Sequence, residues 1–207
     1  MDSYPSADEV FDDLGDKVLN AISAAVALTK VDLARYRQAE PGWVASQSIR
    51  GLANWIHDRL WFHLTDKLDN VPGVTLVDEE PIRELWVGTK YRLRAKRHRE
   101  DDGHVSTYPT QAALDFLSQV QPALEGLERV HLITGYEWNS DSREMGAAVI
   151  SLRDGKENVI WYEKLSPSAA AGSTTRFPVP SQPGPTPPVI EVEGAAERES
   201  LGGADSA

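Results

Sequence analysis

Basic side chains alternate along one predicted strand, and this pattern suggests binding chemistry. Residues 83–99 contain seven of the 21 Lys and Arg residues and a single acid, so they carry a local charge of +6 and leave −17 on the rest of the chain. Side chains two positions apart lie on the same face of a strand. The sequence therefore predicts one cationic face, which Arg83 joins from the preceding strand and which otherwise consists of Lys90, Arg92, Arg94, Lys96 and His98.

Three interpretations of this cationic face stay open. It can bind an acidic protein partner, it can bind the phosphates of a nucleic acid, or it can be a solvated face balanced by the chain's own acids, such as residues 100–102. The formal net charge of −11 argues against a general nucleic-acid coat, although not against a local basic site.

A second group of polar residues lies on a predicted helix and suggests a different chemistry. Arg50, Asn54 and His57 are four and three positions apart, so they share one helix face. Six residues separate Arg50 from His57, a spacing that is also seen in HEPN-type helical ribonucleases. There the arginine would stabilise the scissile phosphate and the histidine would transfer a proton. The alternative interpretation is a packing histidine and a surface arginine, so no catalytic residue is assigned.

Glu84 is the one acid within the basic segment, and the expected strand pairing places it on an apolar face. It is then a buried carboxylate of the kind found in active sites, unless the pairing is displaced by one residue.

The sequence lacks the motifs of several common classes of enzyme and metal site. The sequence contains no Walker loop, G-x-G-x-x-G, H-E-x-x-H or G-x-S-x-G motif. His57-Asp58 matches the dipeptide of HD phosphohydrolases, but the other histidines do not supply the expected metal-ligand pattern. The residues from Glu137 onward resemble the start of a calcium-binding loop, but Ser142 stands where that loop requires a glycine. We expect neither a metal nor a cofactor.

Helices are predicted for the first third of the chain. Ser6 and Glu9 have capping-box spacing, and the apolar stripe that follows extends toward Tyr36 before Pro41-Gly42 ends it. A second helix is predicted for residues 48–68.

After Gly73 the pattern changes to that of strands. Residues 82–87 and 90–99 are expected to form a hairpin with a two-residue turn at Gly88-Thr89, in which Trp86 faces Tyr91 and Glu84 faces Leu93. A helix at 110–120 and strands at 130–137, 147–152 and 158–163 complete the pattern. We therefore predict an α+β domain over residues 1–165, with a helical part (6–69) packed on a mostly antiparallel sheet (74–165).

The last segment, 166–207, has the composition of a disordered tail because it carries seven of the 13 prolines among Ser, Ala and Gly. Within it, the segment Val189–Glu193 can add as a strand to a partner's sheet, or it is a chance apolar cluster in a linker.

The amino-acid composition excludes several further classes of protein. There is no cysteine, which excludes disulfide scaffolds, thiolate zinc sites and cysteine nucleophiles. No apolar run reaches the roughly 18 residues of a membrane span, and the acidic start of the chain is unlike a secretory signal. We expect a soluble, cytoplasmic protein that does not bind membranes. The six tryptophans are spread along the chain, which favours core packing over a stacking platform.

Residues 48–165 resemble a family of small bacterial proteins that are frequent in actinobacteria and their mobile elements. The resemblance rests on four segments: Ile56–Arg59, Tyr91–Arg97, Tyr108–Gln111 and Leu132–Tyr136. It implies membership of a regulatory, phage or toxin–antitoxin-like pair and brings no catalytic residue. The first hypothesis is therefore a non-enzymatic interaction protein that binds an acidic partner through the cationic face. The alternative is a nucleic-acid-binding protein, or an RNA-acting nuclease or toxin that uses Arg50 and His57.

Overall fold

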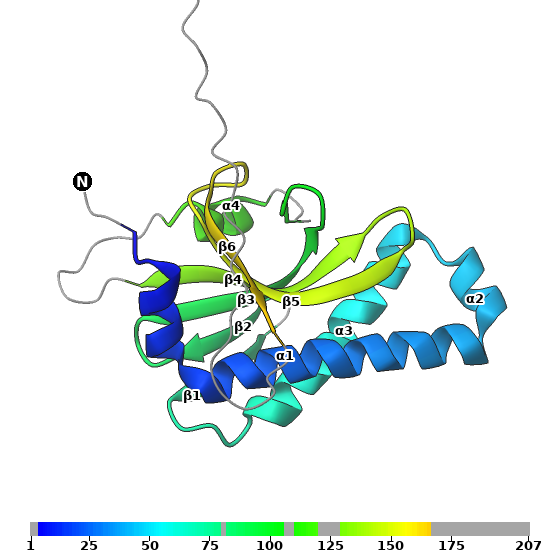
Figure 1. The fold of residues 1–207 in the computed structure, drawn as a ribbon, viewed down its shortest axis with the longest axis horizontal. Coiled ribbons are helices and arrows are strands. Elements are labelled where there is room, and N and C mark those ends of the chain that lie inside the picture. Colours follow the sequence, from blue (N-terminus) through cyan, green and yellow to red (C-terminus); the bar gives the residue numbers. More distant parts are fainter. Residues whose placement is uncertain (1–3, 80–81, 106–109, 120–128, 167–207) are drawn as a thin grey trace, which may run out of the picture.

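Two long helices lie against one face of a six-stranded sheet, and a short helix lies on the other side (Figure 1). The computed structural model describes residues 4–79, 82–105, 110–119 and 129–166. The helices are α1 (Ala7–Ala39), α2 (Pro41–Ser46), α3 (Ile49–Leu68) and α4 (Gln111–Leu117). The strands are β1 (Val74–Glu79), β2 (Ile82–Val87), β3 (Tyr91–Arg99), β4 (Val130–Asn139), β5 (Glu144–Arg153) and β6 (Val159–Leu165).

The two long helices begin where the sequence predicts. The Ser6 side chain accepts a hydrogen bond from the Glu9 backbone N–H at the start of α1, and Ser48 does the same for Gly51 at the start of α3. Each hydroxyl satisfies one of the N–H groups that a helix start leaves unpaired. Helix α2 is not among the predicted elements, because Pro41-Gly42 indicates the end of a helix, whereas proline also suits the first turn of a new one.

The sheet is mostly antiparallel, which confirms the predicted α+β class. Its strands follow sequence order from β1 to β6, and every neighbouring pair is antiparallel except β3 and β4. Parallel strands need a crossover connection, and here the connection between β3 and β4 contains α4. Strand β1 is an edge strand that the sequence analysis missed.

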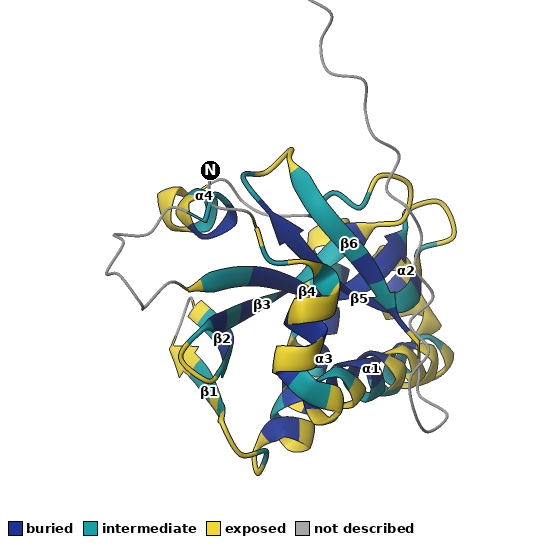
Figure 2. Cartoon of the chain, turned by 60° about the vertical axis from the view of Figure 1, so that its left-hand side comes forward, coloured by how far each residue is buried: buried dark blue, intermediate teal, exposed yellow. Residues whose placement is uncertain are grey.

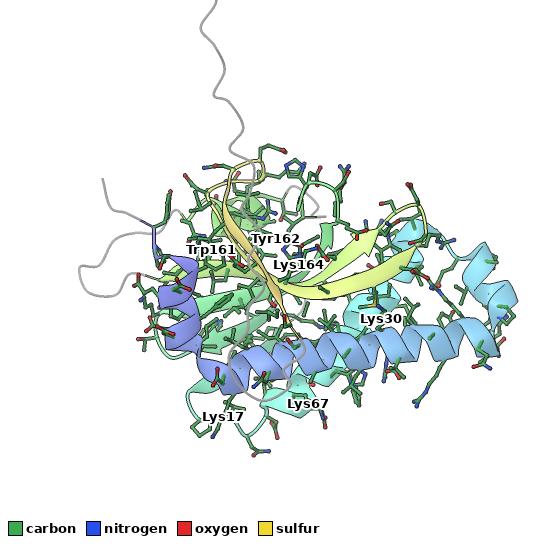
Figure 3. All side chains as sticks on the ribbon, in the orientation of Figure 1. Lys17, Lys30, Lys67, Trp161, Tyr162 and Lys164 are labelled. Atoms are coloured by element: carbon green, nitrogen blue, oxygen red, sulfur yellow. The ribbon has the colours of Figure 1, made fainter. Side chains whose placement is uncertain are left out.

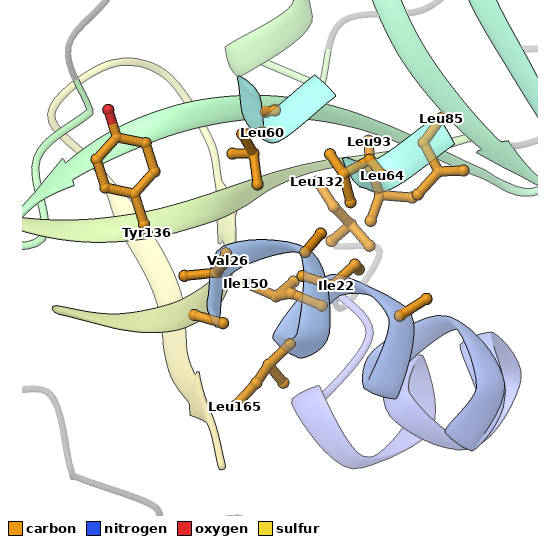
Figure 4. Close-up of a cluster of buried hydrophobic side chains, with 14 of the residues drawn as sticks. Ile22, Val26, Leu60, Leu64, Leu85, Leu93, Leu132, Tyr136, Ile150 and Leu165 are labelled. Atoms are coloured by element: carbon orange, nitrogen blue, oxygen red, sulfur yellow. The ribbon is translucent and has the colours of Figure 1, made fainter. Parts of the chain in front are cut away.

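The two faces of the sheet carry separate apolar clusters. Leu132 of β4 belongs to the large core that α1 and α3 share with the sheet, whereas its neighbour Ile133 packs with Phe116 and Leu117 of α4. Successive side chains of a strand point to opposite faces, so the long helices and α4 cover different faces of the sheet. Figure 4 shows the large core between α1, α3 and the strands. In Figure 2 exposed residues mark the outer side of α1.

The tryptophans divide between core and surface. Trp61 and Trp138 are buried, as predicted, but the Trp43 side chain in α2 is 66% exposed. The prediction of core packing is therefore wrong for Trp43.

The hairpin of β2 and β3 has a three-residue turn, Gly88–Lys90, and not the predicted two-residue turn. Val87 pairs with Tyr91, and Trp86 pairs with Arg92. A displacement of one residue transfers every side chain of a strand to the other face. Glu84 and Trp86 consequently lie on the α4 face of the sheet, together with the even-numbered residues of β3.

The segment Val189–Glu193 and the rest of the predicted tail from residue 167 onward lie outside the described residues.

Candidate functional site

The alternation predicted for β3 is present in the structure. Tyr91, Leu93 and Ala95 belong to the large core under α1 and α3. The side chains between them therefore lie on the α4 face, and these are Arg92, Arg94, Lys96 and His98. Arg83 is not part of this face, since the corrected pairing places it on the helix side, and Lys90 lies in the turn before β3.

Arg83 and Lys90 are neutralised within the chain. Arg83 donates to Asp58 of α3 at 2.6 Å and to Asp78 of β1 at 3.0 Å. Lys90 Nζ lies 2.8 Å from Asp13 Oδ2, and this hydrogen bond raises the pKa of the lysine above its usual value. Both cations therefore connect the hairpin to the helices and add little to a binding surface.

Glu84 is the centre of the charged face, because three side chains gather around its buried carboxylate. Arg94 donates to Glu84 Oε1 from Nε and from Nη2, at 2.9 and 2.7 Å. Trp86 Nε1 donates to Oε2 at 2.7 Å, and Arg92 Nη1 lies 3.8 Å from the same oxygen. Glu84 is thus a counterion within a network, and not the lone carboxylate on an apolar face that the predicted pairing suggested.

Both arginines of this network also lie against aromatic rings. The Arg92 guanidinium carbon is 3.9 Å from the centroid of the Trp86 ring, and that of Arg94 is 4.0 Å from the centroid of Phe116. Contacts of this type fix the guanidinium plane and add electrostatic attraction to packing. We call the group Glu84, Trp86, Arg92, Arg94 and Phe116 the stacked-arginine site.

Arg92 keeps its hydrogen-bonding capacity. Within the described part of the chain its guanidinium has no hydrogen-bond acceptor, since the Glu84 oxygen at 3.8 Å is too distant for a hydrogen bond. Its side chain retains 22% exposure. Burial, together with the positive charge of Arg129, lowers the pKa of Arg92, although an arginine still stays protonated at neutral pH. The site therefore presents a charged and oriented donor group.

Lys96 lies one position further along the same face and is half-buried. Burial, followed by the nearby charge of Arg94, lowers the pKa of Lys96. Among the described residues Lys96 has no acidic partner.

His98 is fully buried and does not contribute to a basic surface. Its Nε2 lies 3.1 Å from Ser151 Oγ, and its ring meets the edge of Tyr162. Burial lowers the pKa of His98 to about 3, so the ring is neutral at physiological pH. The prediction that His98 takes part in a cationic surface is therefore wrong, because the tertiary fold covers this end of β3.

The buried polar region around His98 continues on β6. Tyr162, which is labelled in Figure 3 together with Lys164, donates to Glu137 Oε1 at 2.8 Å. Lys164 Nζ is 2.7 Å from the same oxygen. Burial and this hydrogen bond raise the pKa of Tyr162 above its usual value. Glu137 of β4 therefore has two partners on β6, reached across the intervening strand β5, as a buried carboxylate requires.

The alternative nuclease residues all lie on α3, one to two helical turns apart. Arg50 and Asn54 are exposed, whereas His57 is half-buried. Seven positions along a helix amount to a rise of about 10 Å, and in the described part of the chain no hydrogen bond joins these three side chains. Burial, and then the charges of Lys96 and Arg83, lower the pKa of His57.

A further polar cluster between α1 and α3 was missed by the sequence analysis. Asp32 Oδ2 accepts hydrogen bonds from Arg59 Nε at 3.0 Å and lies 2.8 Å from His63 Nε2. Burial by itself would raise the pKa of Asp32, but the hydrogen bonds from Arg59 and His63 outweigh it and lower the value. The spacing of Arg59 and His63, one helical turn apart, was the available signal.

The residues within the described ranges offer no metal centre, because no three His, Asp or Glu side chains gather closely enough to hold an ion. None of the helices there combines the length and the apolar character needed to cross a bilayer.

Comparisons of the chain with protein-family models, with curated proteins and with solved structures found no match. The resemblance to a bacterial family therefore stays a prediction, and the site has to be interpreted from its own geometry.

Proposed function

We propose that this chain is a non-enzymatic interaction protein that binds an acidic segment of a protein partner through the stacked-arginine site. The observation that carries the proposal is the state of Arg92. Its guanidinium carbon lies over the Trp86 ring, 3.9 Å from the centroid, and the guanidinium has no hydrogen-bond acceptor among the described residues.

An arginine held in this way suits carboxylate recognition. The guanidinium is planar and can donate two parallel hydrogen bonds to one carboxylate. Its stacking on Trp86 orients it before a partner arrives, which reduces the conformational entropy lost on binding. Glu84 holds the neighbouring Arg94 in place by the two short hydrogen bonds described above, so the charged group is rigid.

The charge balance favours an acidic protein over a nucleic acid. Arg83 and Lys90 are paired with acids of the same chain, and His98 is neutral. The charges that remain of the predicted cationic face are the three cations Arg92, Arg94 and Lys96, together with the single anion Glu84. Duplex DNA carries about one charge per 1.7 Å of its axis, and proteins that bind it neutralise several phosphates. A chain with a net charge of −11 and so few unpaired cations on this face is poorly suited to that task.

The wider context of the proposal is a regulatory, phage or toxin–antitoxin-like pair, which rests on the sequence resemblance alone. A nuclease that uses Arg50 and His57 remains the alternative, and no contact between these two residues supports it.

The experiment measures the affinity of the full chain for three labelled probes by fluorescence anisotropy. The probes are a short peptide of alternating Glu and Val, its Lys-containing counterpart and a duplex DNA. We expect the acidic peptide to bind and its affinity to fall about tenfold or more in Arg92→Glu, because one charge-assisted contact is replaced by repulsion. Arg92→Lys should lose part of the affinity, since lysine keeps the charge but not the planar fork.

Arg35→Glu is the matched control, because Arg35 is 77% exposed on α1 and undergoes the same charge reversal. It should leave the affinity unchanged. The proposal is overturned if the acidic peptide does not bind, if Arg92→Glu binds it as well as the wild type does, or if only the DNA binds.

A further inference from the structure

Arg92 has a cationic neighbour directly before strand β4. Arg92 of β3 is the register partner of His131 on β4. Val130 packs against the large core, so the residues on either side of it, Arg129 and His131, point toward the opposite face of the sheet. The His131 ring agrees with this direction, because it stacks on Phe116 of α4. Arg129 therefore lies beside Arg92 at the stacked-arginine site.

The electrostatics of Arg92 show how close this neighbour is. Burial, and next the positive charge of Arg129, lower the pKa of Arg92. The Glu84 carboxylate opposes this change less strongly than Arg129 produces it, although a Glu84 oxygen lies only 3.8 Å from Arg92 Nη1. Arg129 is exposed to solvent, and the Arg92 side chain retains part of its exposure. Two guanidinium groups are therefore close neighbours at the surface.

Like charges side by side repel each other, and an anion between them removes the repulsion. Glu84 does not serve this purpose, because its hydrogen bonds go to Arg94 and Trp86. A carboxylate from outside would bring one charge and two oxygens. A phosphate monoester brings a charge of about −1.5 to −2 at neutral pH and three strong acceptor oxygens, so it can accept from two guanidinium groups at once.

We infer that the acidic group bound at the stacked-arginine site is the phosphate monoester of a phosphorylated side chain in the partner's segment. Arg92 and Arg129 hold its oxygens from two sides, as clusters of arginine do in the recognition of phosphorylated motifs. The phosphodiester of a nucleic acid carries a single charge, which matches the two arginines less well. This inference rests on the proposed function and names the acid that the partner contributes.

A polypeptide suits the site better than a free phosphate. Since Arg129 is exposed, a small phosphate stays largely hydrated there and gains few contacts besides the two arginines. The residues that flank a phosphorylated side chain add contacts of their own, and these offset the cost of association.

Fluorescence anisotropy of the full chain compares labelled peptides that share the sequence of alternating Glu and Val. The central Glu is kept, or it is replaced by serine, by phosphoserine or by the phosphate methyl ester of phosphoserine. We expect phosphoserine to bind at least about tenfold more tightly than Glu, because it adds a charge and further charge-assisted hydrogen bonds. The methyl ester has lost one charge and should bind about as tightly as Glu.

The variant Arg129→Gln separates phosphate recognition from a general attraction of acids. It should weaken the phosphoserine peptide about tenfold and the Glu peptide by less than about threefold, since the carboxylate needs only Arg92. Arg129→Lys keeps the charge and should retain part of the preference. Arg35→Gln makes the same change at an exposed arginine of α1 and is the matched control, which should alter neither affinity.

Equal affinity for the Glu and phosphoserine peptides, or an equal loss of both in Arg129→Gln, overturns the inference and leaves the proposed function standing. If neither peptide binds, both are wrong. Free O-phosphoserine is the last probe. If it binds as tightly as the phosphoserine peptide does, the ligand is a small phosphate ester and the assignment to a polypeptide is wrong.

Discussion

Arg94 and Glu84 form a two-point ion pair in which Nε and Nη2 of the arginine both donate to one carboxylate oxygen, at 2.9 and 2.7 Å. The second oxygen of Glu84 accepts from Trp86. A single buried acid thus fixes an arginine of β3 and an aromatic side chain of β2, and it organises the whole charged face.

The variant Glu84→Gln should lose stability. The amide can still accept from Trp86, but it leaves Arg94 and Arg92 without their only anion on this face among the described residues, and breaking a buried pair in this way costs about 3 kcal/mol. Urea unfolding followed by circular dichroism measures the change. Glu79→Gln, at an exposed position of β1, is the control and should shift stability by less than about 0.5 kcal/mol. Equal stability of both variants would contradict the central role of Glu84.

His98 should make the protein sensitive to acid. Its pKa is about 3 in the folded chain against an ordinary value of 6.5, so between these pH values the unfolded chain binds a proton that the folded chain does not. Stability therefore falls as the pH is lowered below 6.5, by about 1.4 kcal/mol per pH unit for this one group.

The measurement compares the free energy of unfolding of wild type and His98→Gln from pH 7 downward. The substitution also alters the contact with Ser151, so the slope against pH is the readout and not the absolute stability. We expect a shallower slope for the variant. Parallel slopes would show that His98 is not buried in its neutral form.

Gly135 should tolerate no side chain. Its φ is +143°, and a Cβ atom there would lie 1.9 Å from the backbone oxygen of Lys96 on β3. Gly135→Ala must therefore separate β3 from β4, the one parallel pair of the described sheet, at a cost that we expect to exceed about 3 kcal/mol. Thermal unfolding measures it, with Gly42→Ala as control because nothing lies within 4 Å of that added atom. A normal melting temperature for Gly135→Ala would contradict this pairing.

Much of the fold could be predicted because it depends on local patterns. Ser6 and Ser48 cap helices as their spacing predicts, and the alternation along β3 places Arg92, Arg94 and Lys96 on one face. The edge strand β1 was missed because its pattern is short and half-buried, and such a pattern gains its structure from pairing with β2.

The sequence by itself determined helices α1, α3 and α4, the mostly antiparallel character of the sheet and the separation of charge along the chain. Tertiary structure decided which charges remain unpaired. Lys90 forms a hydrogen bond with Asp13, 77 residues away in the sequence, and Arg83 forms one with Asp58, 25 residues away. The periodicity of a single helix or strand does not predict such contacts. A turn longer by one residue placed Glu84 beside Arg94, because side-chain direction alternates with every residue of a strand. The stacked-arginine site follows from that packing.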